Sequence, residues 1–567
     1  MEHEEGVPTN NSMSENDQDA AKAAGWNMWS ADKRTEALKS FVKDRTVDVS
    51  NVLRKLSAKM EDLDREVFDK GFDYMVHRIN KPTDSPVEHV ERAPSLSMKG
   101  RIVFFSTSGC EDCRAVRSFL RKKGLPYIEI NVDIYPHRKL ELEERTGTSS
   151  LPQVFFNEVF IGGIHELKAM EASRELDEKL KPVFELESPA TAPQPPVPGE
   201  EIKSLAESKD DLADIANKLK EKVQIKDRLQ KIHWFTRCFV GSEAVGILAE
   251  NENCSREEAV GLGKKLGNKF FFQHVLLEKD FQDENHLYRF LEHDPVVLSY
   301  CFNFDGTINM SEPKSAKEME ISFRKVSQAI VEQYISEDGR HVDYEGISKS
   351  AEFKRYLSIA HQLHRVNLLG LTREEKLAFF INLYNAMAIH AVIALGHPDG
   401  PLDRRKFFGD FQYLVGGSPF SLSAIENGVL RGNQRPPYSF IKSFGPKDNR
   451  LKISLQEPTP LVHFALSCAT RSSPPVNSFT PENIDAELRF AARSFFREGG
   501  FKIDMGTKTI TLSQIMNWYN VDFGSSELEM LKWIADYLEP AKAEVLLQLL
   551  EGEYKVVYEA YDWSPNF

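Results

Sequence analysis

Cysteine is scarce in this chain, with six residues among 567. Only Cys110 and Cys113 lie close together in sequence, so the cysteines do not form the disulfide framework of a small secreted protein. The sequence also lacks a second cluster of cysteine and histidine with metal-ligand spacing, which argues against a zinc site. We therefore expect no bound metal and a single place where thiol chemistry is concentrated.

The chain contains fewer basic than acidic residues, and its formal net charge is −14. General nucleic-acid binding needs a cationic surface that displaces counterions, so no nucleic-acid partner is expected. The first residues, Met1-Glu2-His3-Glu4-Glu5, lack the apolar segment of a secretory signal. We expect a reducing, intracellular environment and a cytoplasmic protein.

Long apolar runs are missing with one exception, residues 377–395, which contain no Asp, Glu, Lys or Arg. This stretch is long enough to cross a bilayer. It also contains Asn382, Asn385 and His390, whose polar side chains are costly in hydrocarbon. A buried helix in a domain core is therefore favoured over the alternative, a membrane-spanning helix.

The length of the chain predicts about three or four domains. Residues 1–98 are expected to form a disordered tail and a helical lead-in. An α/β domain is expected over residues 99–185, because short apolar strands alternate with helical segments there. Residues 186–208 contain five prolines and predict an extended linker. Over residues 209–295 we expect helices through Leu266 and then a two-strand wing, and over residues 315–567 a mainly α-helical region with some strands.

The Cys110-Glu111-Asp112-Cys113 segment follows a predicted strand, residues 102–105, and opens a predicted helix. The free N–H groups and partial positive charge of a helix N-terminus stabilise a thiolate at Cys110. Cys113 lies one turn further on, where it can attack a mixed disulfide and close a ring. We therefore predict Cys110 and Cys113 as catalytic residues. Half of a zinc site and inert structural cysteines are the alternatives.

Residues 100–184 resemble a glutaredoxin, a family with a thioredoxin-like α/β fold. The resemblance rests on the strand–CxxC–helix opening, on Ser150-Leu151-Pro152, where glutaredoxins have a cis proline, and on Gly162-Gly163-Ile164-His165-Glu166. It implies glutathione as the reductant and a protein disulfide or glutathionylated protein as the substrate. It further implies that glutathione is bound by the residues Leu151, Pro152, Gly162, Gly163 and Glu166.

The sequence departs from the glutaredoxin pattern in three ways. Thr107 replaces a lysine that meets a glutathione carboxylate in the family, and Arg145 or His137 would have to substitute for it. His165 replaces a small or acidic residue. Glu111 and Asp112 replace a Pro-Tyr pair, and two carboxylates beside Cys110 disfavour its thiolate. We expect a slower thiol than in a typical dithiol glutaredoxin.

Residues 212–292 resemble a DEP domain, a winged-helix α+β module of signalling proteins. The resemblance rests on residues 223–228, 238–245, 281–283 and 287–290, which follow the family order. It implies docking to a membrane surface or a receptor tail rather than catalysis. A local excess of lysine and arginine between residues 218 and 237 is consistent with attraction to anionic lipid, and a solvated helix face is the alternative.

Residues 320–567 resemble domain of unknown function 547, through the segments 379–386, 425–431, 463–468 and 561–564. The three domains in this order look like a plant multidomain arrangement. Cys468 and His463 suggest a nucleophile and its base. An offset of five residues on one expected helix would, however, point the two side chains apart. Asn382 and Asn385 are interpreted as buried polar groups satisfied by the backbone.

Two functions compete for the whole chain. The first is a glutaredoxin-type oxidoreductase tethered to a DEP docking domain, acting in intracellular redox-linked signal transduction at a peripheral membrane site. The second is a non-catalytic signalling scaffold whose DEP domain binds membrane or protein partners. A weaker third option is iron–sulfur binding by a dimer through Cys110.

Overall fold

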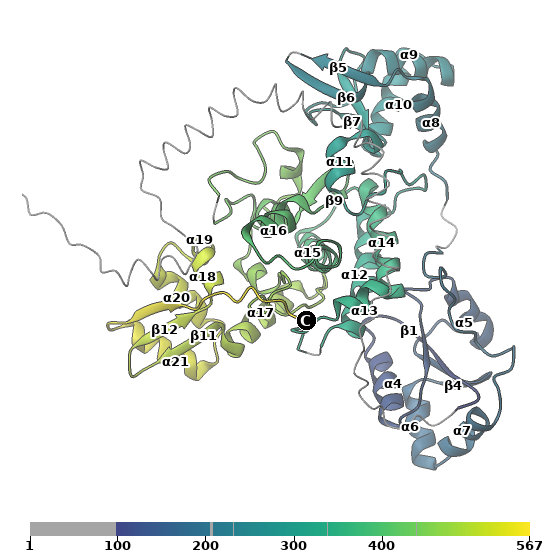
Figure 1. The fold of residues 1–567 in the computed structure, drawn as a ribbon, viewed down its shortest axis with the longest axis vertical. Helices are drawn as coiled ribbons and strands as arrows, with labels where there is room; N and C mark the ends of the chain where they lie inside the picture. Colours follow the sequence, from purple (N-terminus) through teal and green to yellow (C-terminus); the bar gives the residue numbers. More distant parts are fainter. Residues whose placement is uncertain (1–97, 204–207, 231, 337, 438) are drawn as a thin grey trace, which may run out of the picture. The chain divides into compact units, whose positions relative to one another are not determined.

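The computed structural model of the protein describes residues 98–567, except 204–207, 231, 337 and 438 (Figure 1). The tail and lead-in expected for residues 1–98 therefore lie outside the described residues, apart from Met98. All the described residues belong to one compact unit, Val87–Phe567.

The first region contains a sheet with strand order β2-β1-β3-β4. Its strands are β1 Ile102–Ser106, β2 Ile128–Asn131, β3 Gln153–Phe156 and β4 Val159–Gly162. β1 pairs in parallel with β2 and antiparallel with β3, so it has a neighbour on each side. All five β1 residues are buried, which accounts for the nearly uninterrupted apolar sequence of this strand.

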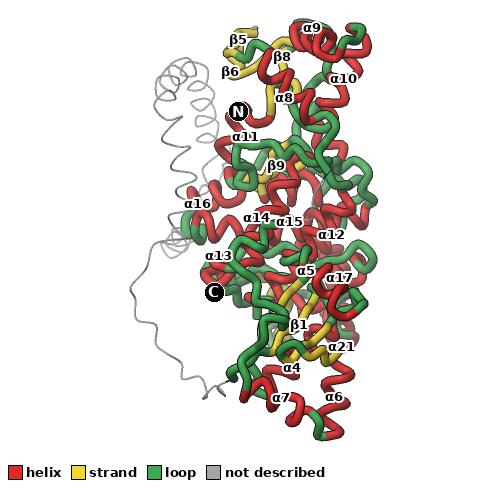
Figure 2. The backbone as a smooth tube through the Cα atoms, turned by 90° about the vertical axis from the view of Figure 1, so that its right-hand side faces the viewer, coloured by secondary structure: helices red, strands yellow, loops and turns green. Residues whose placement is uncertain are grey.

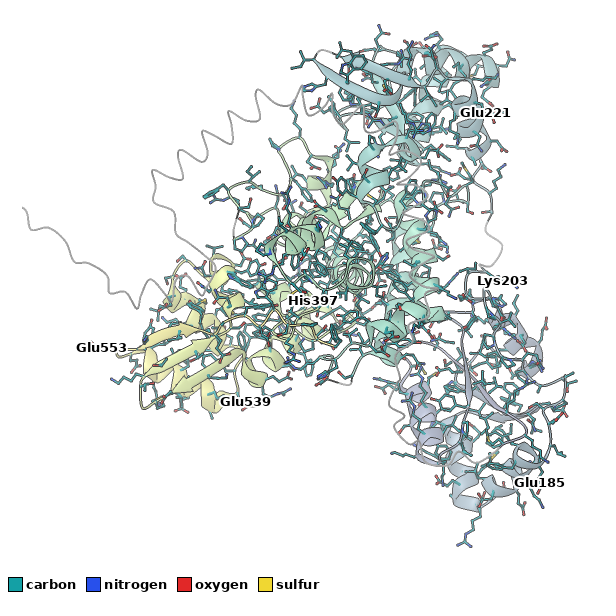
Figure 3. The ribbon with its side chains drawn as sticks, in the orientation of Figure 1. Glu185, Lys203, Glu221, His397, Glu539 and Glu553 are labelled. Atoms are coloured by element: carbon teal, nitrogen blue, oxygen red, sulfur yellow. The ribbon has the colours of Figure 1, made fainter. Side chains whose placement is uncertain are left out.

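Four helices accompany this sheet, namely α4 Glu111–Lys122, α5 Arg138–Thr146, α6 Ile164–Ser173 and α7 Leu176–Glu185. Glu185, labelled in Figure 3, is the last residue of α7. One core packs Val116 and Leu120 of α4 against Ile102 and Phe104, while Leu142 of α5 packs in a second core. The first region has the thioredoxin-like α/β fold that the sequence predicts.

The proline-rich segment has no helix or strand over residues 186–203. It packs along the first region rather than running free of it. Arg145 of α5 donates a hydrogen bond from Nη1 to the Thr191 carbonyl (2.6 Å), and Glu200 is paired with Arg138 and with His137. Residues of α5 and its N-terminal end therefore fix the position of this segment, which the proline content predicts as an extended linker.

The middle region has the strand order β5-β6-β8-β7. Its elements are α8 Ala213–Lys222, β5 Lys226–Gln230, β6 His233–Val240, α9 Gly241–Glu252, α10 Arg256–Asn268, β7 Phe272–His274, β8 Leu287–Phe290 and α11 Pro295–Tyr300. The prediction of helices through Leu266 is wrong between α8 and α9, where β5 and β6 form an antiparallel hairpin. Most of the hairpin's side chains are exposed or half-buried, so its sequence lacks the alternation that reveals a strand.

Aromatic rings fill the core of this middle region. Phe239 contacts Phe290 with 5.0 Å between ring centroids and Phe272 with 5.3 Å. Gly241 is required at the start of α9, because a Cβ there would lie 2.5 Å from the carbonyl oxygen of Gln282. The wing expected near residues 287–290 corresponds to β7 and β8.

The C-terminal region is built around α15, Arg373–Leu395, which packs against α12, Ala316–Tyr334 (Figure 2). Thr372 and Glu375 form the capping box at the start of α15. By length and composition α15 could cross a membrane, but 89% of its 18-residue apolar window is buried inside the structure. This burial supports the interpretation of α15 as a core helix.

The other C-terminal helices are α13 Tyr344–Lys349, α14 Ala351–Gln362, α16 Pro401–Arg405, α17 Ile484–Phe495, α18 Gln514–Trp518, α19 Asn520–Phe523, α20 Glu527–Ala535 and α21 Pro540–Leu550. The strands are β9 Gln412–Val415, β10 Ser418–Ser421, β11 Phe501–Asp504, β12 Thr509–Leu512 and β13 Lys555–Tyr558. β9 and β10 form a hairpin, and β11, β12 and β13 form a separate sheet in that order. This region is mainly α-helical with some strands, as predicted.

Candidate functional site

Cys110 lies at the N-terminal end of α4, directly after the loop formed by residues 107–109. Its backbone is extended (φ −88°, ψ 121°), and its Sγ accepts a hydrogen bond from the Cys113 N–H at 3.3 Å. The residue is half-buried, and both cysteines are free thiols in this structure. A sulfur in this position receives the partial positive charge and an N–H group of the first helical turn.

Cys113 occupies a different environment, because its side chain is completely buried. Burial raises the pKa of the Cys113 thiol, which therefore remains protonated at neutral pH. Of the two sulfurs, the half-buried Cys110 is the one that an external disulfide can reach. The pair thus has an outer attacking sulfur and an inner sulfur one helical turn away.

The charges near Cys110 are mostly negative. Glu111 and Asp112 occupy the first turn of α4, and the exposed Arg114 lies 3.8 Å from Glu111. Arg117 is buried between two carboxylates, with 2.8 Å to Glu129 and 3.1 Å to Glu332. The guanidinium of Arg117 is therefore already compensated and does not offset the acidic pair.

Strand register brings three loops to one edge of the first sheet. Phe105 of β1 pairs with Gln153 of β3, so the loop after β1 lies beside Leu151 and Pro152, which precede β3. Gly162, the last residue of β4, pairs with Val154 near the start of β3. The sites predicted from sequence at Cys110, Leu151, Pro152, Gly162 and Gly163 therefore share this edge.

The Leu151–Pro152 peptide bond is cis, as the family resemblance implies. The backbone of Gly163 approaches Pro152 so closely that a Cβ on Gly163 would lie 3.3 Å from the Pro152 carbonyl oxygen. Gly162 has φ +110°, and a Cβ there would lie 2.7 Å from Cγ of Glu166. Both glycines are thus needed for the close approach of these two loops.

Glu166 has a structural role that the sequence did not reveal. Its Oε2 accepts a hydrogen bond from the Gly163 N–H at 2.7 Å and closes the capping box of α6. Hydrogen bonds from its own backbone N–H and from that of Gly163 lower the pKa of this exposed carboxyl. Glu166 is therefore an anion fixed beside Gly163.

Arg145 and His137, the two substitutes considered for the missing lysine, are committed elsewhere. Arg145 pairs with Glu141 at 2.9 Å as well as bonding Thr191, and His137 contacts Glu200 at 2.7 Å. Lys325 of α12 instead donates hydrogen bonds to Thr107 Oγ1 (2.9 Å) and to the Ser108 carbonyl (3.3 Å). No sequence signal pointed to Lys325, because 218 positions separate it from Thr107.

His463 and Cys468 do not form a catalytic pair. The expected common helix is wrong, since a short 3₁₀ helix, Pro460–Phe464, ends between them. His463 Nε2 lies 2.8 Å from Asp522, whereas Cys468 Sγ lies 3.2 Å from the hydroxyl of Tyr561. Burial raises the pKa of the Cys468 thiol, which suits a core residue.

Asn382 and Asn385 are buried polar groups paired with backbone, as predicted. Asn382 donates to the Phe479 carbonyl (2.8 Å) and accepts from the Phe479 N–H (3.0 Å). Asn385 bonds the Ala465 carbonyl and the Ser467 N–H in the same way. Within the described ranges, no three His, Cys, Asp or Glu side chains are grouped as a metal site.

Three protein families match separate parts of the chain. The family described as Glutaredoxin matches residues 102–161, and the Domain found in Dishevelled, Egl-10, and Pleckstrin (DEP) matches residues 222–290. The Protein of unknown function, DUF547, matches residues 368–496.

Individual proteins are also similar to parts of the chain. A glutaredoxin of Pseudomonas aeruginosa is 32% identical over 76 residues, which are 13% of this chain and 90% of that protein. The human phosphatidylinositol 3,4,5-trisphosphate-dependent Rac exchanger 2 protein is 43% identical over 67 residues, 12% of this chain and 4% of that protein. The solution structure of glutaredoxin from Brucella melitensis shares 31% identity, with a TM-score of 0.14, over 15% of this chain and 90% of that one. Through its first described region the chain belongs to the glutaredoxin family, and it carries a DEP domain and a DUF547 region behind it.

Proposed function

We propose that the glutaredoxin domain is a glutathione-linked thiol–disulfide oxidoreductase that reduces protein disulfides or glutathionylated proteins. The observation that carries this proposal is Cys110, a half-buried sulfur at a helix N-terminus with a protonated, buried thiol one turn away. Leu151, Pro152, Gly162, Gly163 and Glu166 are the proposed glutathione contacts, because they share the sheet edge with Cys110.

The proposed reaction begins when the Cys110 thiolate attacks one sulfur of a substrate disulfide. A Cys110–substrate disulfide forms, and the other substrate sulfur leaves as a thiolate that takes up a proton. Cys113 then loses its proton and attacks Cys110 Sγ, which forms the Cys110–Cys113 disulfide and releases the second substrate thiol. Two electrons have passed from the dithiol to the substrate. Two glutathione molecules restore the dithiol and leave as glutathione disulfide.

The DEP domain is proposed to dock this activity at an anionic membrane surface or a receptor tail, as a peripheral, cytoplasmic component of redox-linked signalling. The support is an exposed apolar tip on the β5–β6 hairpin, where Leu229, Ile232 and Trp234 are 56%, 86% and 69% exposed. The human relative that is 43% identical over 67 residues is named for dependence on a phosphoinositide lipid. Membrane docking is the form of the proposal that the hairpin tip supports best.

Reduction of a glutathionylated peptide by the full chain, with glutathione and glutathione reductase, tests the enzymatic proposal. Turnover is expected for the parent and should be abolished in Cys110→Ser. Cys113→Ser is the matched control, because it keeps the attacking sulfur and can still be turned over by a second glutathione. Absence of turnover by the parent, with vesicle binding that Cys110→Ser leaves unchanged, would instead support the scaffold alternative.

A further inference from the structure

One face of α12 in the C-terminal region contacts the loop that leads to Cys110. Lys325, Gln328 and Glu332 are spaced i, i+3 and i+7, so they share one side of the helix. Glu332 accepts a hydrogen bond from the Gly109 N–H at 2.9 Å and forms an ion pair with Arg117. A Cβ on Gly109, which has φ +77°, would lie 2.8 Å from Oε1 of Gln328. The contact therefore depends on a glycine directly before the reactive cysteine.

The ammonium of Lys325 lies at the start of this loop. It donates to Thr107 Oγ1 at 2.9 Å and to the Ser108 carbonyl at 3.3 Å, and it lies 3.9 Å from Asp133. The Lys325 side chain is 30% exposed, so it is held by the loop while part of it remains in contact with solvent. An ammonium has three N–H donors; its two hydrogen bonds use two of them, and the Asp133 carboxylate lies within ion-pair distance of the ammonium.

The other charges at this edge leave few groups that could receive an anion. Glu111 and Asp112 repel one, Asp133 lies beside Lys325 and does the same, and the guanidinium of Arg117 is enclosed by Glu129 and Glu332. The remaining cation of α4 near Cys110, Arg114, is 58% exposed and lies beside Glu111. Among these described cations, Lys325 is fixed by two hydrogen bonds to the loop before Cys110 and is partly exposed.

We propose that Lys325 binds a carboxylate of the disulfide that reacts with Cys110, so that the thiol site is completed by the C-terminal region. The ligand class is a disulfide or thiol that carries carboxylates, such as glutathione disulfide. This inference rests on the proposed function, because it assumes that Cys110 exchanges with external disulfides. Lys325 is a binding residue here, since its contacts lie with the loop and not with the sulfur.

The test compares two disulfides as reagents for Cys110 in the full, reduced chain. Glutathione disulfide carries four carboxylates, whereas bis(2-hydroxyethyl) disulfide carries none. In Lys325→Gln, the rate of Cys110 modification by glutathione disulfide is expected to fall by about tenfold, as for a lost hydrogen bond to a charged group. The rate with the uncharged disulfide should be unchanged. Lys325→Arg should restore most of the rate with glutathione disulfide.

Lys317→Gln is the matched control, because Lys317 lies on the same helix and is 72% exposed. It should behave like the parent chain with both reagents. Equal slowing of both disulfides by Lys325→Gln would overturn the inference and assign Lys325 to electrostatic support of the sulfur. Equally faster modification of Cys110 by both disulfides in Lys325→Gln would also overturn the inference and would indicate that α12 covers the site. An unchanged rate with both disulfides would overturn it as well. A parent chain whose Cys110 reacts with neither disulfide would contradict the proposed function itself.

Discussion

The two sulfurs of the thiol site are close in sequence but differ in their exposure to solvent. Cys113 is fully buried and burial raises the pKa of its thiol, whereas Cys110 is half-buried at the end of the helix. In the reduced full chain at pH 8, iodoacetamide should therefore alkylate Cys110 at least about tenfold faster than Cys113. Peptide mapping by mass spectrometry over time measures both rates. Equal labelling, with unchanged circular dichroism, would contradict the division into an outer and an inner sulfur.

Asp522 is the residue on which a buried polar cluster of the C-terminal region depends. It pairs with Arg431 at 2.5 Å and with His463 at 2.8 Å, and both partners are almost completely buried. Asp522→Asn would leave Arg431 as a buried charge without a carboxylate, which costs about 3–5 kcal/mol of unfolding free energy. Denaturant unfolding followed by tryptophan fluorescence measures this loss.

Asp485→Asn is the matched control for Asp522→Asn. Asp485 pairs with Arg373 at 3.2 Å on the surface, where such a pair contributes less than about 1 kcal/mol. If both substitutions lowered the unfolding free energy equally, burial would not be the origin of the Asp522 effect.

The β5–β6 hairpin is the element best suited to insert into a lipid surface. Its tip exposes Ile232 and Trp234, while Lys220 of α8 in the same domain is paired with Glu292 at 2.7 Å. Each apolar side chain transferred from water contributes about 1.5–3 kcal/mol, so the double variant Ile232→Ser/Trp234→Ser should bind vesicles at least about tenfold more weakly. Co-sedimentation with phosphatidylserine-containing vesicles measures this.

Leu276→Ser provides the control for the hairpin. Leu276 belongs to the same domain and is 51% exposed, but it lies outside β5 and β6. Its loss should leave vesicle binding unchanged. Equal weakening by Leu276→Ser, or binding that the double variant keeps in full, would assign any lipid contact to another surface.

Elements whose buried residues form a recognisable sequence pattern could be predicted from the sequence. Elements without such a pattern could not be predicted. The apolar run of β1 and the Thr372–Glu375 capping box of α15 were both visible, because burial and local hydrogen bonding leave a short-range signature. The β5–β6 hairpin was missed because most of its side chains are exposed. At the candidate site, Cys110 and Pro152 were found by spacing and resemblance. The approach of Lys325 was not, since nothing local links positions 218 apart.

The three described regions are held together by contacts of this long-range kind. Arg365 of the C-terminal region is paired with Asp210 in a fully buried position, and its guanidinium lies 4.1 Å from the ring of Phe271 in the DEP domain. Glu332 joins the C-terminal region to the loop before Cys110. Because Glu332 also pairs with the buried Arg117 of α4, we expect the stability of the C-terminal region to influence the thiol site.

Acid should weaken the protein through two buried histidines of the C-terminal region. Burial lowers the pKa of His364 to about 3 and that of His390 to about 3, so both are neutral when folded. Between pH 6.5 and 3 the unfolded chain binds protons that the folded chain cannot, and the unfolding free energy falls as the pH falls. At pH 5 each histidine should cost about 2 kcal/mol relative to pH 7. Denaturant titrations across this range measure the slope.

A variant that cannot titrate separates this effect from general acid sensitivity. His390→Gln keeps an acceptor near the hydroxyl of Tyr413, which lies 2.6 Å from His390 Nδ1, but it binds no proton. Its unfolding free energy should depend less steeply on pH between 7 and 4, whatever its absolute value. Burial alone lowers the pKa of His390, so an unchanged slope in His390→Gln would mean that the folded chain admits a proton there and that α15 opens before the protein unfolds.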